Sequence, residues 1–262
     1  MKNTPANEKI FWNSRARSYP LPFDPSTLGK TKRILRLLGR LGADFTGRDI
    51  LDIGCGTGVY ALILAGKAGR VLGLDSSAAM LRIFRAQGRA RKIKNAHCRE
   101  AAWGDLATAE IRGGFDIALA SMTMAIKGKA DLLKMEASAR ERCVYIGWAG
   151  VRKNNLLEAA YAHHGLEYKA PEGAGRVLNI LRAMRRRPRV QFIIDSWKKS
   201  APPAVTLREI EVNIEVNGAR LDRVWTKALL KRRTRDGKVN QVTRVRKALI
   251  TWKVTPAKQT GP

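Results

Sequence analysis

Cysteine is scarce in this sequence. The three cysteines, Cys55, Cys98 and Cys143, are far apart and odd in number. This spacing provides neither a disulfide framework nor a CxxC pair for a metal ion. We therefore expect no metal site and no disulfide-stabilised extracellular fold, and a reducing cytoplasm is the simplest location.

Long apolar stretches are also missing. No run approaches the roughly 20 residues that a helix needs to span a bilayer. Residues 1–10 include Lys2, Glu8 and Lys9 and no apolar segment, so no signal peptide is expected there. We expect no transmembrane segment, and 262 residues are enough for one large core.

Acidic residues are few relative to basic ones. The sequence has 50 Lys and Arg against 22 Asp and Glu, a net charge of +28. Such a field attracts nucleic acid, anionic membrane surfaces or small acidic molecules. The basic residues are spread over several stretches, among them residues 82–99 and 220–247. Two interpretations stay open, a surface that binds polyanions and a basic face that is simply solvated.

Apolar strands alternate with helices through the first 150 residues. This alternation indicates βαβ units, which form a parallel sheet with helices on both faces. Strands are predicted at 50–53, 71–74, 95–99, 115–120 and 143–147, and helices at 26–41, 59–67, 78–87 and 131–140. Further on, we predict a helix at 176–186, strands at 190–197 and 248–254, and a charged helical insertion at about 203–243.

The first strand contains Asp52 and runs into the turn Gly54-Cys55-Gly56-Thr57-Gly58. Glycines let the chain turn tightly and let a ligand approach the backbone without a clash with Cβ. The second strand ends at Asp75, where nucleotide-binding folds keep the acid that accepts the ribose hydroxyls. The third glycine of an NAD fingerprint would fall at Val59, so the pattern is not that of an NAD enzyme.

Three segments resemble the motifs of class I S-adenosylmethionine (SAM)-dependent methyltransferases, notably the group that includes the ubiquinone and menaquinone C-methyltransferases. They are LDIGCGTGVYALILA, VLGLDSSAAML and FDIALASM, and the resemblance covers about residues 10–150. It implies a Rossmann-like α/β fold with a seven-stranded, mostly parallel sheet, helices on both faces and an antiparallel last strand. An acid beside the turn suits SAM, which carries an ammonium and a sulfonium and leaves S-adenosylhomocysteine (SAH) as product.

The resemblance also implies which residues contact SAM. The glycine turn would wrap the methionine part, and Asp75 would bind the ribose. Ala102 stands where the family usually has an acid after the third strand, so backbone groups beside Trp103 would recognise the adenine. The expected cofactor-binding residues are Tyr19, Asp52, Gly54, Cys55, Gly56, Gly58, Asp75, Ser76, Met80, Ala102, Trp103, Ser121 and Met122.

The expected organisation has three parts. Residues 1–48 form an N-terminal lid segment and helix, residues 49–150 the SAM-binding core, and residues 151–262 the rest of the same sheet with the substrate-side insertion. The pair His163-His164 has no companions at metal-ligand spacing, and no residue is identified as a general base. We expect a monomer or homodimer that methylates a small, acidic molecule; the alternative is an enzyme that acts on RNA or another polyanion through its basic surface.

Overall fold

The computed structural model describes residues 5–170 and 173–254. The ends of our predicted first and third parts, residues 1–4 and 255–262, lie outside the described residues. The chain divides into two compact units. The core unit comprises residues 2–147, 176–191 and 248–262, and the smaller unit comprises residues 148–175 and 192–247.

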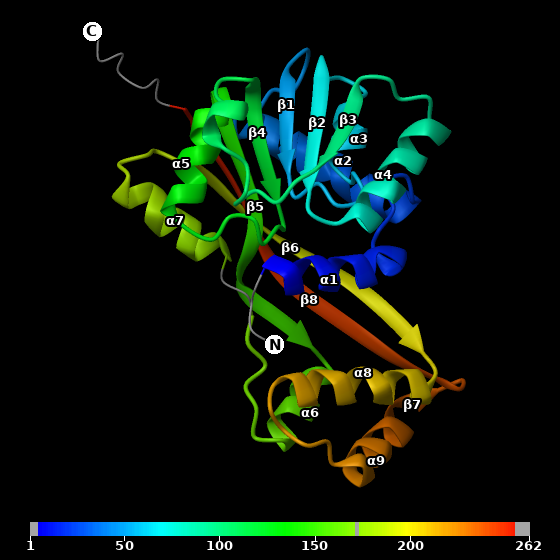
Figure 1. Cartoon of the computed structure of the whole chain (residues 1–262). Helices are drawn as coiled ribbons and strands as arrows, with labels where there is room; N and C mark the ends of the chain where they lie inside the picture. Colours follow the sequence, from blue (N-terminus) through cyan, green and yellow to red (C-terminus); the bar gives the residue numbers. More distant parts are fainter. Residues whose placement is uncertain (1–4, 171–172, 255–262) are drawn as a thin grey trace, which may run out of the picture. The chain divides into compact units, whose positions relative to one another are not determined.

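A parallel sheet organises the core unit. Its strands pair in the order β3-β2-β1-β4-β5, and each of these neighbouring pairs is parallel. In Figure 1 the carboxyl ends of β1, β2 and β4 point to the same edge, beside helix α1. Strand order reverses between β1 and β4, and open α/β sheets bind ligands at such a point. The bounds are β1 Asp49–Ile53, β2 Arg70–Asp75, β3 Ala96–Glu100, β4 Phe115–Ser121 and β5 Ala139–Asn154.

Helices cover this sheet with their apolar faces. In α2, for example, Ile34, Leu35 and Leu38 recur at helical spacing and are buried. Helix α4 begins after Ser77, whose hydroxyl accepts a hydrogen bond from the Met80 N–H at 3.2 Å. The helices are α1 Pro5–Arg15, α2 Pro25–Arg40, α3 Ala61–Leu64, α4 Ala78–Ala90, α5 Lys129–Ser138 and α7 Gly173–Ala183, with short 3₁₀ turns η1 Ala16–Ser18 and η2 Thr108–Glu110.

Within the core unit, a buried carboxylate connects helix α5 to two segments from later in the chain. Glu136 of α5 accepts two hydrogen bonds from the Arg186 guanidinium, both at 2.8 Å, and one from the Trp252 indole N–H at 2.8 Å. Arg186 follows α7, and Trp252 lies near the end of the last strand, β8 Lys238–Lys253. This pairing satisfies a charge that would otherwise be costly to bury.

The smaller unit has an apolar core of its own. Leu156, Ala160, Ile214 and Leu230 are among its buried residues. Buried Asn154 accepts hydrogen bonds from the first turn of α6 and donates to Thr243 at 2.8 Å. Its elements include α6 Leu157–His163, α8 Pro203–Val216, α9 Arg223–Arg233 and β7 Thr234–Arg235.

The predicted fold class is confirmed, and the two-residue β7, which pairs antiparallel with β8, is an additional strand. Three predicted strands were too short: β5, β6 Arg189–Ala201 and β8 Lys238–Lys253 extend well beyond 143–147, 190–197 and 248–254. The 203–243 stretch contains two helices, as expected, but its last residues belong to β8. Helix α6 was not predicted.

Among the described helices, none is both long and apolar enough to cross a membrane.

Replacing Gly58 with alanine should destabilise the core unit. Gly58 has φ +88°, and an added Cβ would lie 2.7 Å from Phe84 and 2.9 Å from Leu62. We expect Gly58→Ala to lower the free energy of unfolding by about 2 kcal/mol, because strain and overpacking add. Urea denaturation measures this. The control is Gly29→Ala in α2, which meets nothing within 4 Å and should stabilise by about 0.5 kcal/mol; equal effects of the two changes would refute the interpretation.

Candidate functional site

The glycine turn follows β1 at the carboxyl edge of the sheet. Gly54 and Gly56 have φ of +71° and +55°, a region that residues with a Cβ rarely adopt. At Gly54 a Cβ would lie 2.1 Å from the Thr123 hydroxyl, so the loop after β4 requires a glycine there. At Gly56 the nearest atom would be Cε1 of Tyr19, at 3.6 Å. The backbone at Gly56 is therefore open to a ligand.

Asp75 connects this turn to helix α4. One carboxylate oxygen accepts the Gly56 N–H at 2.8 Å, and the other accepts the Ser77 N–H at 2.8 Å. Burial raises the pKa of Asp75, although the two backbone hydrogen bonds oppose this shift. The carboxylate is thus fixed in orientation and only partly solvated, which strengthens its interaction with any cation that it meets.

Asp52 is the penultimate residue of β1 and is buried, with 2% of its surface exposed. Burial raises its pKa to about 7, a hydrogen bond from the Ala61 N–H opposes the shift, and the charge of Asp75 adds to it. Partly buried Tyr19 lies near the same two acids, so burial and the charges of Asp75 and Asp52 raise the pKa of its phenol. The two acids of the sequence motif therefore interact with each other, as expected for adjacent strands.

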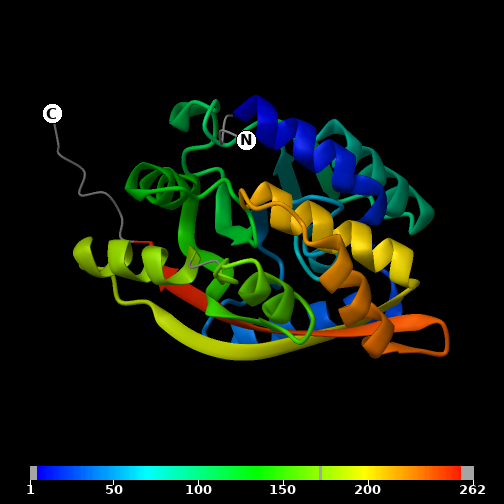
Figure 2. The ribbon, with the colours of Figure 1, turned by 90° about the horizontal axis from the view of Figure 1, so that it is seen from below.

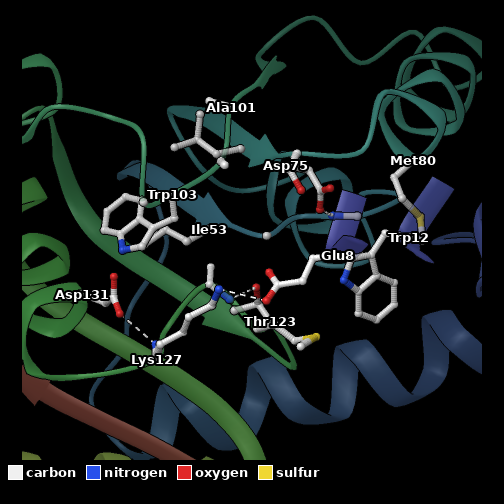
Figure 3. Close-up of a pocket in the computed structure, with 18 of the residues that line it drawn as sticks. Glu8, Trp12, Ile53, Asp75, Met80, Ala101, Trp103, Thr123, Lys127 and Asp131 are labelled. Atoms are coloured by element: carbon white, nitrogen blue, oxygen red, sulfur yellow. Dashed lines mark hydrogen bonds and ion pairs between the residues drawn. The ribbon is translucent and has the colours of Figure 1, made fainter. Parts of the chain in front are cut away.

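A pocket opens between the turn and the loops that follow β3 and β4. It encloses about 970 Å³, counting its open mouth and the solvent there. Figure 3 shows Asp75, Met80 and Trp103 around this space, and all its lining residues belong to the core unit. Of the expected cofactor-binding residues, those that line it are Tyr19, Gly54, Gly56, Asp75, Ser76, Met80, Ala102, Trp103 and Met122.

The other expected residues lie behind the pocket wall. Asp52 and Cys55 are buried, and a Cβ on Gly73 would lie 2.7 Å from the Cys55 sulfur. Burial raises the pKa of the Cys55 thiol well above its ordinary value, so this cysteine is not a reactive nucleophile. Gly58 packs against the core, and the buried Ser121 hydroxyl makes no hydrogen bond within the described part of the chain.

Helix α1, which belongs to the expected N-terminal lid segment, supplies a wall of the pocket. Its Glu8 and Trp12 line the space, and Glu8 pairs with Lys127 at 2.9 Å (Figure 3). Asn13 holds the helix against α4, because its side-chain oxygen accepts hydrogen bonds from the Ser77 hydroxyl at 2.7 Å and the Ala79 N–H at 3.2 Å. Glu8 and Trp12 were not among the expected cofactor-binding residues.

The loop after β3 forms the opposite wall. Trp103 is 4% exposed, and the Lys134 ammonium lies 4.9 Å from its ring centre. Lys134 also donates hydrogen bonds to the backbone carbonyls of Trp103 and Leu106, which fixes the loop. The Trp103 indole N–H has no hydrogen-bond partner among the described residues.

The pocket is acidic although the chain is strongly basic. Its lining includes Glu8, Asp75, Asp105 and Asp131 but only one basic residue, Lys127. Asp131 accepts the backbone N–H groups of Lys127 and Gly128, so it mainly caps α5. The excess of carboxylates favours a ligand with positive charge. Sequence reasoning missed this feature, because Glu8, Asp105, Lys127 and Asp131 belong to no motif.

One further lining residue has an unusual backbone. Met122, directly after β4, has φ +52°, a left-handed conformation that costs free energy in a residue with a Cβ. Its N–H donates to the Ile146 carbonyl at 2.8 Å, which holds it in place. Strained residues of this kind gather at functional sites. No group of three or more metal-binding side chains occurs among the described residues.

Comparisons with known proteins agree with this geometry. Residues 50–142 match a family model described as a methyltransferase domain. No curated protein matches the sequence significantly.

Solved structures share the fold at low sequence identity. YcgJ protein from Bacillus subtilis superposes with a TM-score of 0.52 at 13% identity, covering 86% of this chain and 98% of its own. Geranyl diphosphate C-methyltransferase from Streptomyces coelicolor A3(2), in complex with Mg²⁺, geranyl diphosphate and SAH, has a TM-score of 0.52 at 17% identity, covering 97% and 100%. DhpI in complex with SAH has a TM-score of 0.51 at 14% identity, covering 96% and 97%.

The stability of the protein should depend on the ionisation of Asp52. Its pKa is raised from 3.8 to about 7, so between these values the folded chain holds a proton that the unfolded chain has lost. The free energy of unfolding then falls as pH rises from about 4 to about 7. Between pH 5 and pH 8, the free energy of unfolding of the wild type, measured by urea denaturation, should fall by about 2 kcal/mol more than that of Asp52→Asn, whose side chain stays neutral.

The control for this prediction is Asp236→Asn, in an exposed turn. It should follow the wild-type pH profile. If Asp52→Asn followed it too, the buried carboxyl would not titrate in this range and the prediction would be wrong.

Proposed function

We propose that this chain, whose residues 50–142 match a methyltransferase domain and whose fold resembles that of an SAH-bound methyltransferase, is a class I SAM-dependent methyltransferase. Its pocket binds SAM, and the methyl group passes to a small-molecule acceptor. The observation that carries the proposal is the Asp75 carboxylate, held between the glycine turn and α4 and facing the pocket.

The residues present fit this cofactor. The bare backbone at Gly56 leaves room for a ligand, and a partly desolvated acid stands beside it. The acidic lining suits a ligand that carries an ammonium and a sulfonium. We propose that Asp75 accepts hydrogen bonds from the ribose, with Ser76 and Met80 beside the adenosine and Ala102 and Trp103 at the adenine.

Bound SAM supplies an electrophilic methyl group on sulfur. The chain's own contribution is to hold that group and the acceptor in line and to keep water away. Trp12 and Trp103 line opposite sides of the pocket and suit the exclusion of water. Asp52 and Cys55 support the turn from behind, so we propose for them, and for Gly58 and Ser121, an indirect part in cofactor binding.

The acceptor pocket should lie on the side of Trp12, Met124 and Lys127. Geranyl diphosphate, the ligand of the Streptomyces neighbour, is a small molecule, which supports the same class of acceptor here. The net charge suggested an acidic acceptor, whereas the acidic lining favours a neutral or cationic one. The three free cysteines remain consistent with the proposed cytoplasmic location. The alternative acceptor, an RNA or other polyanion, has one observation in its favour, the exposed arginines of α4.

Removing the Asp75 carboxylate should weaken SAM binding. We expect Asp75→Ala to raise the Kd for SAM about 30- to 100-fold in titration calorimetry, because two hydrogen bonds to a charged group are lost. The matched control is Asp105→Ala, which removes an exposed acid from the same pocket and should change Kd less than threefold.

Thermal melts of both variants test whether the turn still folds. Wild-type affinity in a folded Asp75→Ala variant would mean that SAM binds elsewhere. Absence of SAM binding by the wild type would overturn the proposed function itself.

A further inference from the structure

A second hollow of the core unit lies on the other side of α1 from the pocket, between α1–η1 and α4. It encloses about 830 Å³, counting its open mouth. In Figure 2, α1 runs beside α4, and the polar contacts of Asn13 with α4 fix their separation. We call this hollow the α1–α4 groove; its lining residues are Asn13, Ala16, Arg17, Ala79, Arg82, Ile83 and Ala86.

The shape of the groove comes from small side chains. Ala16, Ala79 and Ala86 form much of its lining, and the longer side chains of Arg17 and Arg82 come from opposite elements. A trough with an apolar floor and a guanidinium on each side is shaped for an anionic chain. A flat membrane surface would not reach such a floor.

The charge continues along α4 beyond the groove. Arg82, Arg85 and Arg89 are exposed, and their spacing of three and four residues places them on one face of the helix, whereas Leu81 and Phe84 are buried. At 1.5 Å per residue this row is about 10 Å long. It is therefore longer than one phosphate group needs.

No acidic partner of these arginines occurs among the described residues. Helix α4 contains no Asp or Glu, and within the described residues neither Arg17 nor Arg82 forms an ion pair. The glutamates that end β3 and η2 already form ion pairs with other basic residues. Glu100 pairs with Lys9 at 2.7 Å, and Glu110 pairs with Arg99 at 2.8 Å. Neighbouring like charges on one helix face are mutually destabilising.

The helix dipole does not account for this placement. Cations stabilise the C-terminal turn of a helix, which explains Arg89. Arg82 lies in the N-terminal half of α4, where the dipole offers it no stabilisation. Guanidinium groups are also the side chains that best match phosphate oxygens with paired hydrogen bonds.

We propose that the α1–α4 groove binds the phosphodiester backbone of single-stranded RNA, with Arg17 and Arg82 on its two sides and Arg85 and Arg89 extending the path. The groove lies outside the SAM pocket, so this binding does not depend on the acceptor or on methyl transfer. It gives the basic stretch after residue 82 a function that the cofactor site does not.

The test is fluorescence anisotropy of the intact protein with a labelled 20-nucleotide single-stranded RNA, titrated at several salt concentrations between 50 and 200 mM. We expect the double variant Arg17→Gln/Arg82→Gln to bind about tenfold more weakly at 100 mM salt. Its log–log salt slope should be shallower by about 1.4, since each lost phosphate contact on a single strand contributes about 0.7.

The matched control is Arg33→Gln/Arg36→Gln in α2, which removes the same charge from another exposed helix face of the core unit. It should stay within about twofold of the wild type. If both double variants lose affinity equally, binding is diffuse and the groove is not a site.

Three other outcomes would also overturn the proposal. The first is no RNA binding by the wild type. The second is loss of RNA binding to 20 mM inorganic phosphate at constant ionic strength, which would indicate a site for a small anion. The third is that the wild-type protein sediments with phosphatidylserine vesicles and does not bind RNA, whereas the Arg17→Gln/Arg82→Gln variant does not sediment with the vesicles. SAM calorimetry on the same variants should be unchanged, which shows that the core is folded and keeps this test separate from that of the proposed function.

Discussion

The site depends on one carboxylate. Asp75 accepts the N–H of Gly56 with one oxygen and that of Ser77 with the other, so a single side chain fixes both the glycine turn and the start of α4. Ser77 in turn caps α4 and donates to Asn13, which holds α1 against the same helix. The shape of the turn, the first turn of α4 and the wall formed by α1 are thus linked through adjoining residues. A ligand that contacts Asp75 therefore contacts the structural centre of the pocket.

Charge is segregated in this protein. Among the described residues no Lys or Arg is buried, whereas the pocket is lined by carboxylates and backed by Asp52. Net charge acts through solvent over distances of about a Debye length, roughly 10 Å, so it governs what approaches the surface. The pocket is governed by groups within a few ångströms, and burial strengthens their effect. The sign of the whole chain therefore does not predict the charge of the pocket lining, and it bears instead on what approaches the surface.

The sequence predicted best where local pattern and tertiary structure agree. β1 and β4 are mostly apolar and mostly buried, and Ser77 is a capping residue directly before an amphipathic helix. Strands β5, β6 and β8 were predicted too short because their extensions alternate exposed and buried residues or are largely polar. Glu8, Lys127 and Asp131 could not be found from the sequence, because residues over a hundred positions apart meet only once the sheet has formed.

The glycine motif shows why a motif predicts a site better than it predicts the residues that line it. Its three glycines meet three different constraints. At Gly54 an added Cβ would clash with Thr123, and at Gly58 it would clash with Phe84 and Leu62. Gly56 borders the pocket beside Tyr19. Of the three, only Gly56 could carry a Cβ without a steric clash with the protein. At this position alone, the space left by the absent side chain is available to a ligand. Gly54 and Gly58 are required to bring β4 and α4 close enough to form the pocket. The motif thus reflects how the chain forms the cavity as much as which ligand the cavity binds. The ligand contacts predicted from the motif therefore include residues that do not line the pocket.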